Sequence, residues 1–272
     1  MFETLFEYLQ FSFFQRAIIV GLLVAISSSF LGSFLVLKKF SMIGDGLAHV
    51  SFASVALAIL LGESPILVSI PIVVIASIFI LVLNEKANIH GDAAIGLISS
   101  FSIAIGVIII GFGEGFNIDI NSYLFGNILT TDQRDVILSF ILTIFVILTV
   151  ILFYNQLFSI TYDEEYAKVN EVNTKLANYL LAILTAITIV LGIRIVGTML
   201  ISSMIIFPTV TALQITRGFK QTIIYSAIIA LLSVFFGFLL TISLDTSPGA
   251  SIVLVNGLLF MIAYVSRYFK QS

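Results

Sequence analysis

The chain has 272 residues, of which 60% are hydrophobic and 10% are charged, and its mean hydropathy is +1.18. An ordinary soluble domain carries about 25% charged residues, so this composition excludes a soluble enzyme, a disordered linker protein and a nucleic-acid-binding protein. The net charge of −3 provides no basic surface for DNA or RNA. Without cysteine, the chain has no disulfide and no thiolate metal site. The composition predicts a membrane protein that crosses the bilayer several times.

Apolar stretches that are long enough to cross a bilayer, which takes about 20 residues, occur along the whole chain. Nine spans are predicted in this order: 16–37, 43–61, 66–83, 93–112, 135–153, 177–193, 196–215, 222–243 and 250–266. The break in the long apolar stretch 177–215 is assigned to Gly192 and Gly197. Because nine helices use most of the chain, we expect one all-helical transmembrane domain over residues 1–272. The Gly-rich, acidic segment 113–133 is interpreted as re-entrant or interfacial.

The basic residues predict how these spans are oriented. With nine crossings, most of them fall on one side of the membrane: Lys38, Lys39, Lys86, Lys168, Lys175, Arg217, Lys220, Arg267 and Lys270. The other side holds Arg16, Arg134 and Arg194. Because cytoplasmic loops carry an excess of lysine and arginine, we expect the N-terminus outside the cell and the C-terminus in the cytoplasm.

The strongest candidate site is a carboxylate and an imidazole in the second predicted span. Four residues recur at every fourth position and therefore share one helix face: Ser41, Asp45, His49 and Ala53. An ionisable group inside a span is costly and marks a functional hypothesis. Asp45 and His49 are one turn apart and can chelate a divalent ion, and oxygen and nitrogen donors suit Mn, Fe(II) or Zn. A proton relay and a structural hydrogen-bonded pair are alternative roles for the same two side chains.

Two further regions are weaker candidates. His90 and Asp92 lie at the cytoplasmic edge of the fourth predicted span, where a helix cap is favoured over a secondary metal site. The largest predicted cytoplasmic loop, 155–174, contains a pattern typical of a short acidic helix capped at Thr161 or Asp163. Such a helix is either a docking element for a partner or a solvated connector, and composition alone favours the connector.

Nucleotide chemistry can be tested directly in the sequence. A P-loop requires Gly-x-x-x-x-Gly-Lys-Ser/Thr, and the chain has no Gly-Lys dipeptide. The sequence also lacks the His-Glu-x-x-His motif and a nucleophile motif of a membrane protease. We therefore expect that this chain is not itself an enzyme and that any ATP hydrolysis occurs on another polypeptide.

Six sequence blocks occur in an order that resembles the permease subunits of the manganese/zinc/iron ABC importers. The blocks are Leu31–His49, Asp92–Gly96, Leu124–Leu129, Tyr162–Ala167, Val196–Pro208, and Leu244-Asp245 with Pro248-Gly249. Together they extend over nearly the whole chain. The resemblance implies a multi-pass permease of the cell membrane that works by alternating access and imports manganese as the first expectation, with zinc or iron next.

The resemblance also implies roles for individual residues. Asp45 and His49 take the place of the family's intramembrane metal-coordinating pair. The segment 162–171 takes the place of the coupling helix that sits in a cleft of the cytoplasmic ATPase, with its contact residues at Asp163, Glu164, Glu165, Tyr166 and Ala167. Family members usually end this helix in Leu-Gly, whereas this chain has Asn170-Glu171. Since glycine is the usual residue at a helix C-terminus, this departure leaves the end of the helix open.

Finally, the resemblance implies partners. Family members combine two permeases, two cytoplasmic ABC ATPases and an extracellular or periplasmic metal-binding protein, so we expect a permease homodimer in membrane lipid. No cofactor is expected to be bound permanently, because the metal ion is the transported substrate. His49 has to be neutral to bind that ion, so uptake is expected to weaken as the pH falls. The rival functions are a stand-alone proton-coupled secondary transporter, with Asp45 and His49 as the proton relay, and a siderophore or cobalamin permease of a related fold.

Overall fold

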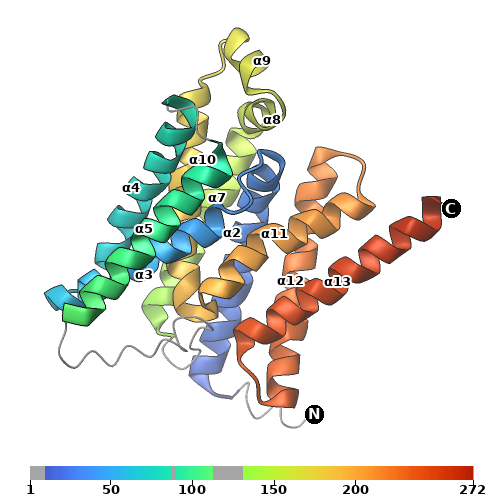
Figure 1. The fold of residues 1–272 in the computed structure, drawn as a ribbon. Coiled ribbons are helices and arrows are strands. Elements are labelled where there is room, and N and C mark those ends of the chain that lie inside the picture. Colours follow the sequence, from blue (N-terminus) through green and yellow to red (C-terminus); the bar gives the residue numbers. More distant parts are fainter. Residues whose placement is uncertain (1–9, 87–89, 113–130, 272) are drawn as a thin grey trace.

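The computed structural model describes residues 10–86, 90–112 and 131–271, and within these ranges the chain forms helices and no strands (Figure 1). The helices are α2 (Ser12–Leu37), α3 (Ile43–Leu61), α4 (Pro65–Lys86), α5 (Gly91–Phe112), α7 (Gln133–Leu152), α8 (Tyr154–Tyr162), α9 (Glu164–Val169), α10 (Thr174–Val196), α11 (Thr198–Ile215), α12 (Phe219–Leu244) and α13 (Pro248–Gln271). The predicted polytopic helical bundle is confirmed. The predicted re-entrant segment 113–133 lies almost entirely outside the described residues.

Each predicted span corresponds to a helix whose ends differ from the predicted ends by a few residues at most. Among the described residues, eight helices are long and apolar enough to cross a membrane. The seventh predicted span corresponds to α11, an 18-residue helix whose described apolar part is Leu200–Ile215. Among the described residues, the eight long helices and the apolar part of α11 together correspond to the nine predicted spans.

The break between α10 and α11 lies at one of the two predicted glycines. Gly197 has φ 84° and ψ 166°, a backbone conformation that is open essentially to glycine alone. Gly192 lies inside α10 instead, and a Cβ atom there would be 2.3 Å from Ile201 Cδ1. The assignment of Gly192 to the break is therefore wrong. That glycine lets α10 and α11 pack closely on either side of the break.

Helix α2 lies at the centre of the bundle, where it packs against α7, α10, α11 and α12 (Figure 1). A Cβ atom at Gly32 would lie 2.3 Å from the carbonyl oxygen of Ile205, so the backbones of α2 and α11 are in direct contact. The hydroxyl oxygens of Ser27 and Thr143 form a buried hydrogen bond of 3.0 Å between α2 and α7. Small residues and interhelical hydrogen bonds replace the hydrophobic driving force that is missing inside a bilayer.

The short helices α8 and α9 lie together at the upper end of the bundle in Figure 1, beyond the ends of α2 and α4 and the start of α10. Four of the residues that predict a cytoplasmic side lie at this end, at the end of α2, in α9 and at the starts of α10 and α12: Lys38, Lys168, Lys175 and Lys220. Which side of a membrane this end faces stays a prediction.

Candidate metal-binding pair and docking segment

The turn between α2 and α3 fixes where Asp45 begins its helix. The Lys38 N–H donates to the Phe34 carbonyl, the Phe40 N–H donates to the Leu35 carbonyl, and Lys39 adopts a left-handed conformation with φ 62°. This tight turn leaves five residues between the two helices. Asp45 then lies in the first turn of α3, where the helix dipole favours a carboxylate.

Asp45 and His49, called here the α3 pair, project from the open face of α3. His49 Nε2 lies 3.8 Å from Asp45 Oδ2, and the two side chains are 34% and 48% exposed, respectively. The other residues of this stretch are buried: Ile43, Gly44, Gly46, Leu47, Ala48 and Val50. A separation of 3.8 Å is too long for a hydrogen bond. The structural hydrogen-bonded pair, which the sequence left as an alternative, is therefore not formed.

Glycines on either side of Asp45 bring α3 close to two neighbouring helices. A Cβ atom at Gly44 would lie 3.3 Å from the Cα of Ser202 in α11, and one at Gly46 would lie 2.5 Å from Ile95 Cγ2 in α5. These small residues let α3 approach the backbone of α11 at Gly44 and the side chain of Ile95 at Gly46. Both contacts fix the rotation of α3 and thereby the direction in which the α3 pair points.

Ser202 is a residue near the site that the sequence analysis did not single out. Its hydroxyl oxygen is buried and has no hydrogen-bond partner among the described residues, and it would lie 3.4 Å from a Cβ atom at Gly44. The available signal was its position inside the block Val196–Pro208. Ser202 therefore packs against Gly44, the neighbour of Asp45 in the chain, with a hydroxyl that no described residue satisfies.

The α3 pair offers only two donors. Over the described ranges, no group of three or more His, Cys, Asp or Glu side chains is placed to hold a metal ion. Zinc takes four ligands in its structural sites, and manganese prefers an octahedral set of oxygen donors. A metal ion at the α3 pair would therefore need further donors besides these two side chains.

His90 and Asp92 lie in a different place. Both are exposed at the start of α5, and they line a surface cavity of about 440 Å³ that also borders Lys39 and Glu164. Asp92 is in the first turn of α5, where its charge is favoured by the helix dipole. The structure does not bring these two residues to the α3 pair, and their predicted secondary metal site gains no third donor in the part of the chain that is described.

The predicted coupling helix is shorter than expected. Asp163 takes an extended conformation and its side chain accepts the Tyr166 N–H at 2.9 Å, so the chain divides into α8, which ends at Tyr162, and α9. Of the two predicted caps, Asp163 is correct. The Thr161 hydroxyl instead donates to the Leu157 carbonyl inside α8. Helix α9 therefore begins and ends two residues inside the predicted segment of about 162–171, because the N-cap aspartate starts a new helix.

The C-terminus of α9 explains the unusual Asn170-Glu171. The Val172 N–H donates to the Ala167 carbonyl and the Glu171 N–H donates to the Lys168 carbonyl, which is the bonding of a Schellman motif. Glu171 occupies the left-handed position with φ 57°, where glycine is normally found. The helix therefore ends in the standard geometry despite the substitution, and Glu171 carries the conformational strain.

The two faces of α9 differ. Ala167 is fully buried against the bundle, whereas Tyr166 and Val169 are 64% and 81% exposed. Asp163 and Glu165 are exposed as well. Large apolar side chains on a short exposed helix are typical of a surface that a partner covers. This arrangement favours the docking element over the solvated connector that composition alone suggested.

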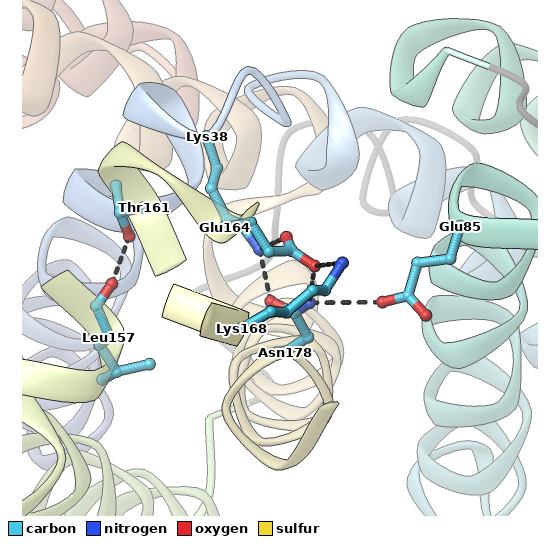
Figure 2. Close-up of polar contacts among 7 residues, drawn as sticks. All are labelled: Lys38, Glu85, Leu157, Thr161, Glu164, Lys168 and Asn178. Atoms are coloured by element: carbon cyan, nitrogen blue, oxygen red, sulfur yellow. Dashed lines mark hydrogen bonds and ion pairs between the residues drawn. The ribbon is translucent and has the colours of Figure 1, made fainter. Parts of the chain in front are cut away.

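A polar network holds α9 against the bundle (Figure 2). Lys38 Nζ lies 3.1 Å from Glu164 Oε2, with side chains that are 9% and 27% exposed. Lys168 Nζ lies 3.3 Å from Glu164 Oε1. Asn178 accepts a hydrogen bond from Lys38 and donates at 3.3 Å to both Glu164 Oε1 and Glu85 Oε1. These five residues, called here the α9 junction, connect α9 with the end of α2, the end of α4 and the start of α10.

Burial and charge act against each other at the α9 junction. Burial lowers the pKa of the Lys38 amine, and the attraction of Glu164 offsets only part of this effect. Burial also disfavours the charged form of Glu164, but Lys38 and Lys168 outweigh it and hold the pKa of this carboxyl below its usual range. Glu164 therefore stays ionised at neutral pH. The sequence identified Glu164 as a contact residue, but it did not predict its partners Lys38 and Asn178.

Comparison with known proteins gives the same architecture. The ABC 3 transport family matches residues 10–267. The chain is 31% identical to the high-affinity zinc uptake system membrane protein ZnuB of Haemophilus influenzae, over 98% of this chain and 99% of ZnuB. It is 30% identical to the manganese transport system membrane protein MntC of Listeria monocytogenes, over 94% of this chain and 91% of MntC.

A solved structure is similar as well. The structure of PsaBC from Streptococcus pneumoniae in complex with Fab contains a chain that superposes with a TM-score of 0.84 at 30% sequence identity, covering 96% of this chain and 94% of that one. Family match, relatives and structure all extend over nearly the whole length. The chain therefore belongs to the ABC 3 transport family, as a multi-pass permease of the cell membrane and not an enzyme.

Proposed function

We propose that this chain is the transmembrane permease subunit of an ATP-driven importer of a divalent transition metal, manganese first, with zinc or iron next. The observation that carries the proposal is the α3 pair: a carboxylate and an imidazole that remain accessible on a helix whose other side chains are buried around them. The relatives named for zinc and for manganese transport support a metal substrate.

The two donors of one chain suit a homodimeric permease. Two copies facing a common pathway would supply two Asp45 carboxylates and two His49 imidazoles, which is enough for a four-coordinate ion and leaves room for water around an octahedral one. Without thiolates, such a site favours Mn, Fe(II) or Zn over Cu(I). We therefore assign the missing donors to a second copy of this chain.

The partners follow from what this chain lacks and exposes. It has no P-loop, so ATP hydrolysis belongs to a cytoplasmic ABC ATPase, and the exposed Tyr166 and Val169 of α9 offer that ATPase a docking surface. An extracellular or periplasmic metal-binding protein delivers the ion to the opposite mouth. ATP binding and hydrolysis then move α9 and alternate the access of the α3 pair to the two sides.

The proposal is tested by uptake of Mn(II), Zn(II) and Fe(II) into proteoliposomes that contain the permease with its native partners, with and without ATP. We expect ATP-dependent uptake of one of these ions, which His49→Ala abolishes. The chain has one other histidine, His90, which lies outside the α3 pair, so His90→Ala is the matched control and retains uptake.

The same experiment separates the rival function. Uptake that ignores ATP and follows a proton gradient would replace the importer by a secondary transporter and make Asp45 and His49 a proton relay. Equal uptake by wild type and His49→Ala, at equal amounts of protein, would remove the α3 pair from the transport pathway.

A further inference from the structure

The α9 junction contains a buried charge that is unfavourable for stability. In a bundle with 10% charged residues, Lys38 buries its ammonium group almost completely, although burial of a charge is expensive and an apolar replacement is often at least as stable. A solvated surface lies one residue further along the chain, since Lys39 is exposed. Stability alone therefore gives no reason to place the amine of Lys38 inside the protein.

Lys38 joins the docking helix to the segment that carries the α3 pair. It directly follows the last residue of α2, and its backbone belongs to the hydrogen-bonded turn that leads into α3. Asp45 follows seven residues later, in the first turn of that helix. A displacement of the Lys38 side chain is thus transmitted to the α2–α3 turn through a short, bonded stretch of backbone.

Helix α9 depends on the Lys38–Glu164 ion pair for its attachment to the bundle, whereas α8 has other contacts. Helix α8 is held by aromatic packing: Phe158 and Tyr162 lie 5.2 and 5.8 Å from the ring of Phe219, which in turn packs on Phe34 of α2. Helix α9 buries only Ala167, and it is separated from α8 by the extended Asp163. Glu164 is therefore the polar attachment of α9 to the bundle.

Asn178 and Glu85 fix the orientation of the Lys38–Glu164 ion pair. The Asn178 amide is 3% exposed and binds Lys38, Glu164 and Glu85 at the same time (Figure 2). It holds the ammonium and the carboxylate in one geometry against α4 and α10. Lys168 pairs with the same carboxylate from within α9, so it leaves the connection to the spans to Lys38 and Asn178.

We propose that Lys38 is a positioning residue for transport: its ion pair with Glu164, braced by Asn178, transmits the movement of α9 to the α2–α3 turn and thereby to Asp45 and His49. This inference rests on the proposed function, because it requires a partner ATPase that moves α9. It assigns to the junction a role in coupling that goes beyond docking. Loss of the link separates ATP hydrolysis from ion movement while both partners remain assembled.

The test compares ATP hydrolysis and metal uptake in proteoliposomes that contain the complete complex. For Lys38→Met we expect uptake to fall about tenfold while ATP hydrolysis changes less than about twofold, as a lost coupling between two sites predicts. The number of ATP molecules hydrolysed per ion therefore rises. Glu164→Gln keeps the shape of the side chain and removes its charge, and it gives the same result should Lys38→Met fail to assemble.

Two further variants sharpen the test. Lys39→Met removes the same charge from the neighbouring, exposed residue, and it leaves the ratio of ATP to ion unchanged. In Lys38→Met/Glu164→Gln the ratio is no worse than in either single variant, because both changes break one pair. Multiplied effects of the two changes would mean that the residues act independently and would overturn the inference.

The failures are distinguishable. Wild type without ATP-dependent metal uptake removes the proposed function and the inference together. Active wild type with equally active Lys38→Met and Glu164→Gln overturns the inference alone. The same holds if uptake and ATP hydrolysis fall in parallel in both variants, since the pair would then serve assembly rather than coupling.

Discussion

Two regions of this apolar chain contain ionisable side chains among the helices. In one region these side chains are paired and largely buried, and in the other they are accessible and not hydrogen-bonded to each other. At the α9 junction, Lys38 and Glu164 are paired and further bonded to Asn178. In the α3 pair, Asp45 and His49 stand 3.8 Å apart and remain accessible. Since an ionisable group inside a membrane bundle needs a partner, the paired cluster is satisfied within the protein, whereas the open pair is consistent with the metal-binding role proposed for it.

The largest effect of a single substitution is expected at the α3 pair. Asp45→Asn keeps the size of the side chain and removes its charge, and we expect metal uptake to fall about 100-fold or more, since even loss of an outer-shell partner of a metal site costs about 10- to 100-fold. Uptake of radioactive or fluorescence-detected metal by intact cells measures the effect. Asp92→Asn, on the exposed start of α5, is the matched control, and equal losses in both variants would contradict the distinction between them.

At the α9 junction, where the charges are paired, a substitution is expected to affect stability. Lys38→Met leaves Glu164 without its main partner, and we expect the free energy of unfolding to fall by about 3 kcal/mol. In Lys38→Met/Glu164→Leu no unpaired charge remains, so most of that loss is recovered. Denaturant unfolding of the detergent-solubilised permease measures both variants. A double variant that is less stable than Lys38→Met would mean that the ion pair itself stabilises the fold.

The close packing around the α3 pair offers a third comparison. A Cβ atom at Gly46 would lie 2.5 Å from the branched Cγ2 of Ile95, which cannot swing away, whereas a Cβ atom at Gly96 meets nothing within 4 Å. We expect Gly46→Ala to cost about 1–3 kcal/mol through overpacking. By contrast, Gly96→Ala should stabilise its helix by about 0.5–1 kcal/mol. Unfolding of the two variants under identical conditions tests this, and similar effects would show that α3 is free to shift.

The sequence predicted well what depends on local pattern. Apolar stretches of spanning length predicted the helices, with α3 correct at both ends, and the four-residue spacing placed Asp45 and His49 on one face because a helix repeats at that interval. The division into α8 and α9 was missed, because an aspartate such as Asp163 inside an acidic stretch is compatible with one helix or two. Local pattern does not decide between them; in the structure the extended, capping Asp163 separates α8 from α9.

Contacts between distant segments could not be predicted in the same way. Lys38 and Glu164 are 126 positions apart in the sequence, and the two lysines after α2 look alike as markers of orientation. Only the fold distinguishes the buried Lys38 from the exposed Lys39. The orphaned hydroxyl of Ser202 likewise depends on the approach of α11 to Gly44.

The smallest expected effect concerns the end of α9. Glu171 sits in the left-handed position of the Schellman motif with φ 57°, where a non-glycine residue costs about 1–2 kcal/mol. Part of the gain from Glu171→Gly is lost to the greater freedom of glycine in the unfolded chain, so we expect α9 to gain about 0.5–1 kcal/mol. Amide hydrogen exchange of α9 measures this, because local opening reports local stability.

The control for this change uses the same pair of residue types at a helical position. Glu165→Gly lies in the first turn of α9, where glycine has no conformational advantage, so exchange in α9 should become faster by a factor that corresponds to about 0.5–1 kcal/mol. Opposite signs for the two variants would establish that Glu171 is strained. If both variants accelerate exchange, the left-handed residue contributes side-chain interactions that outweigh its strain. The junction would then hold the C-terminus of α9 more tightly than the contacts of Glu164 alone explain.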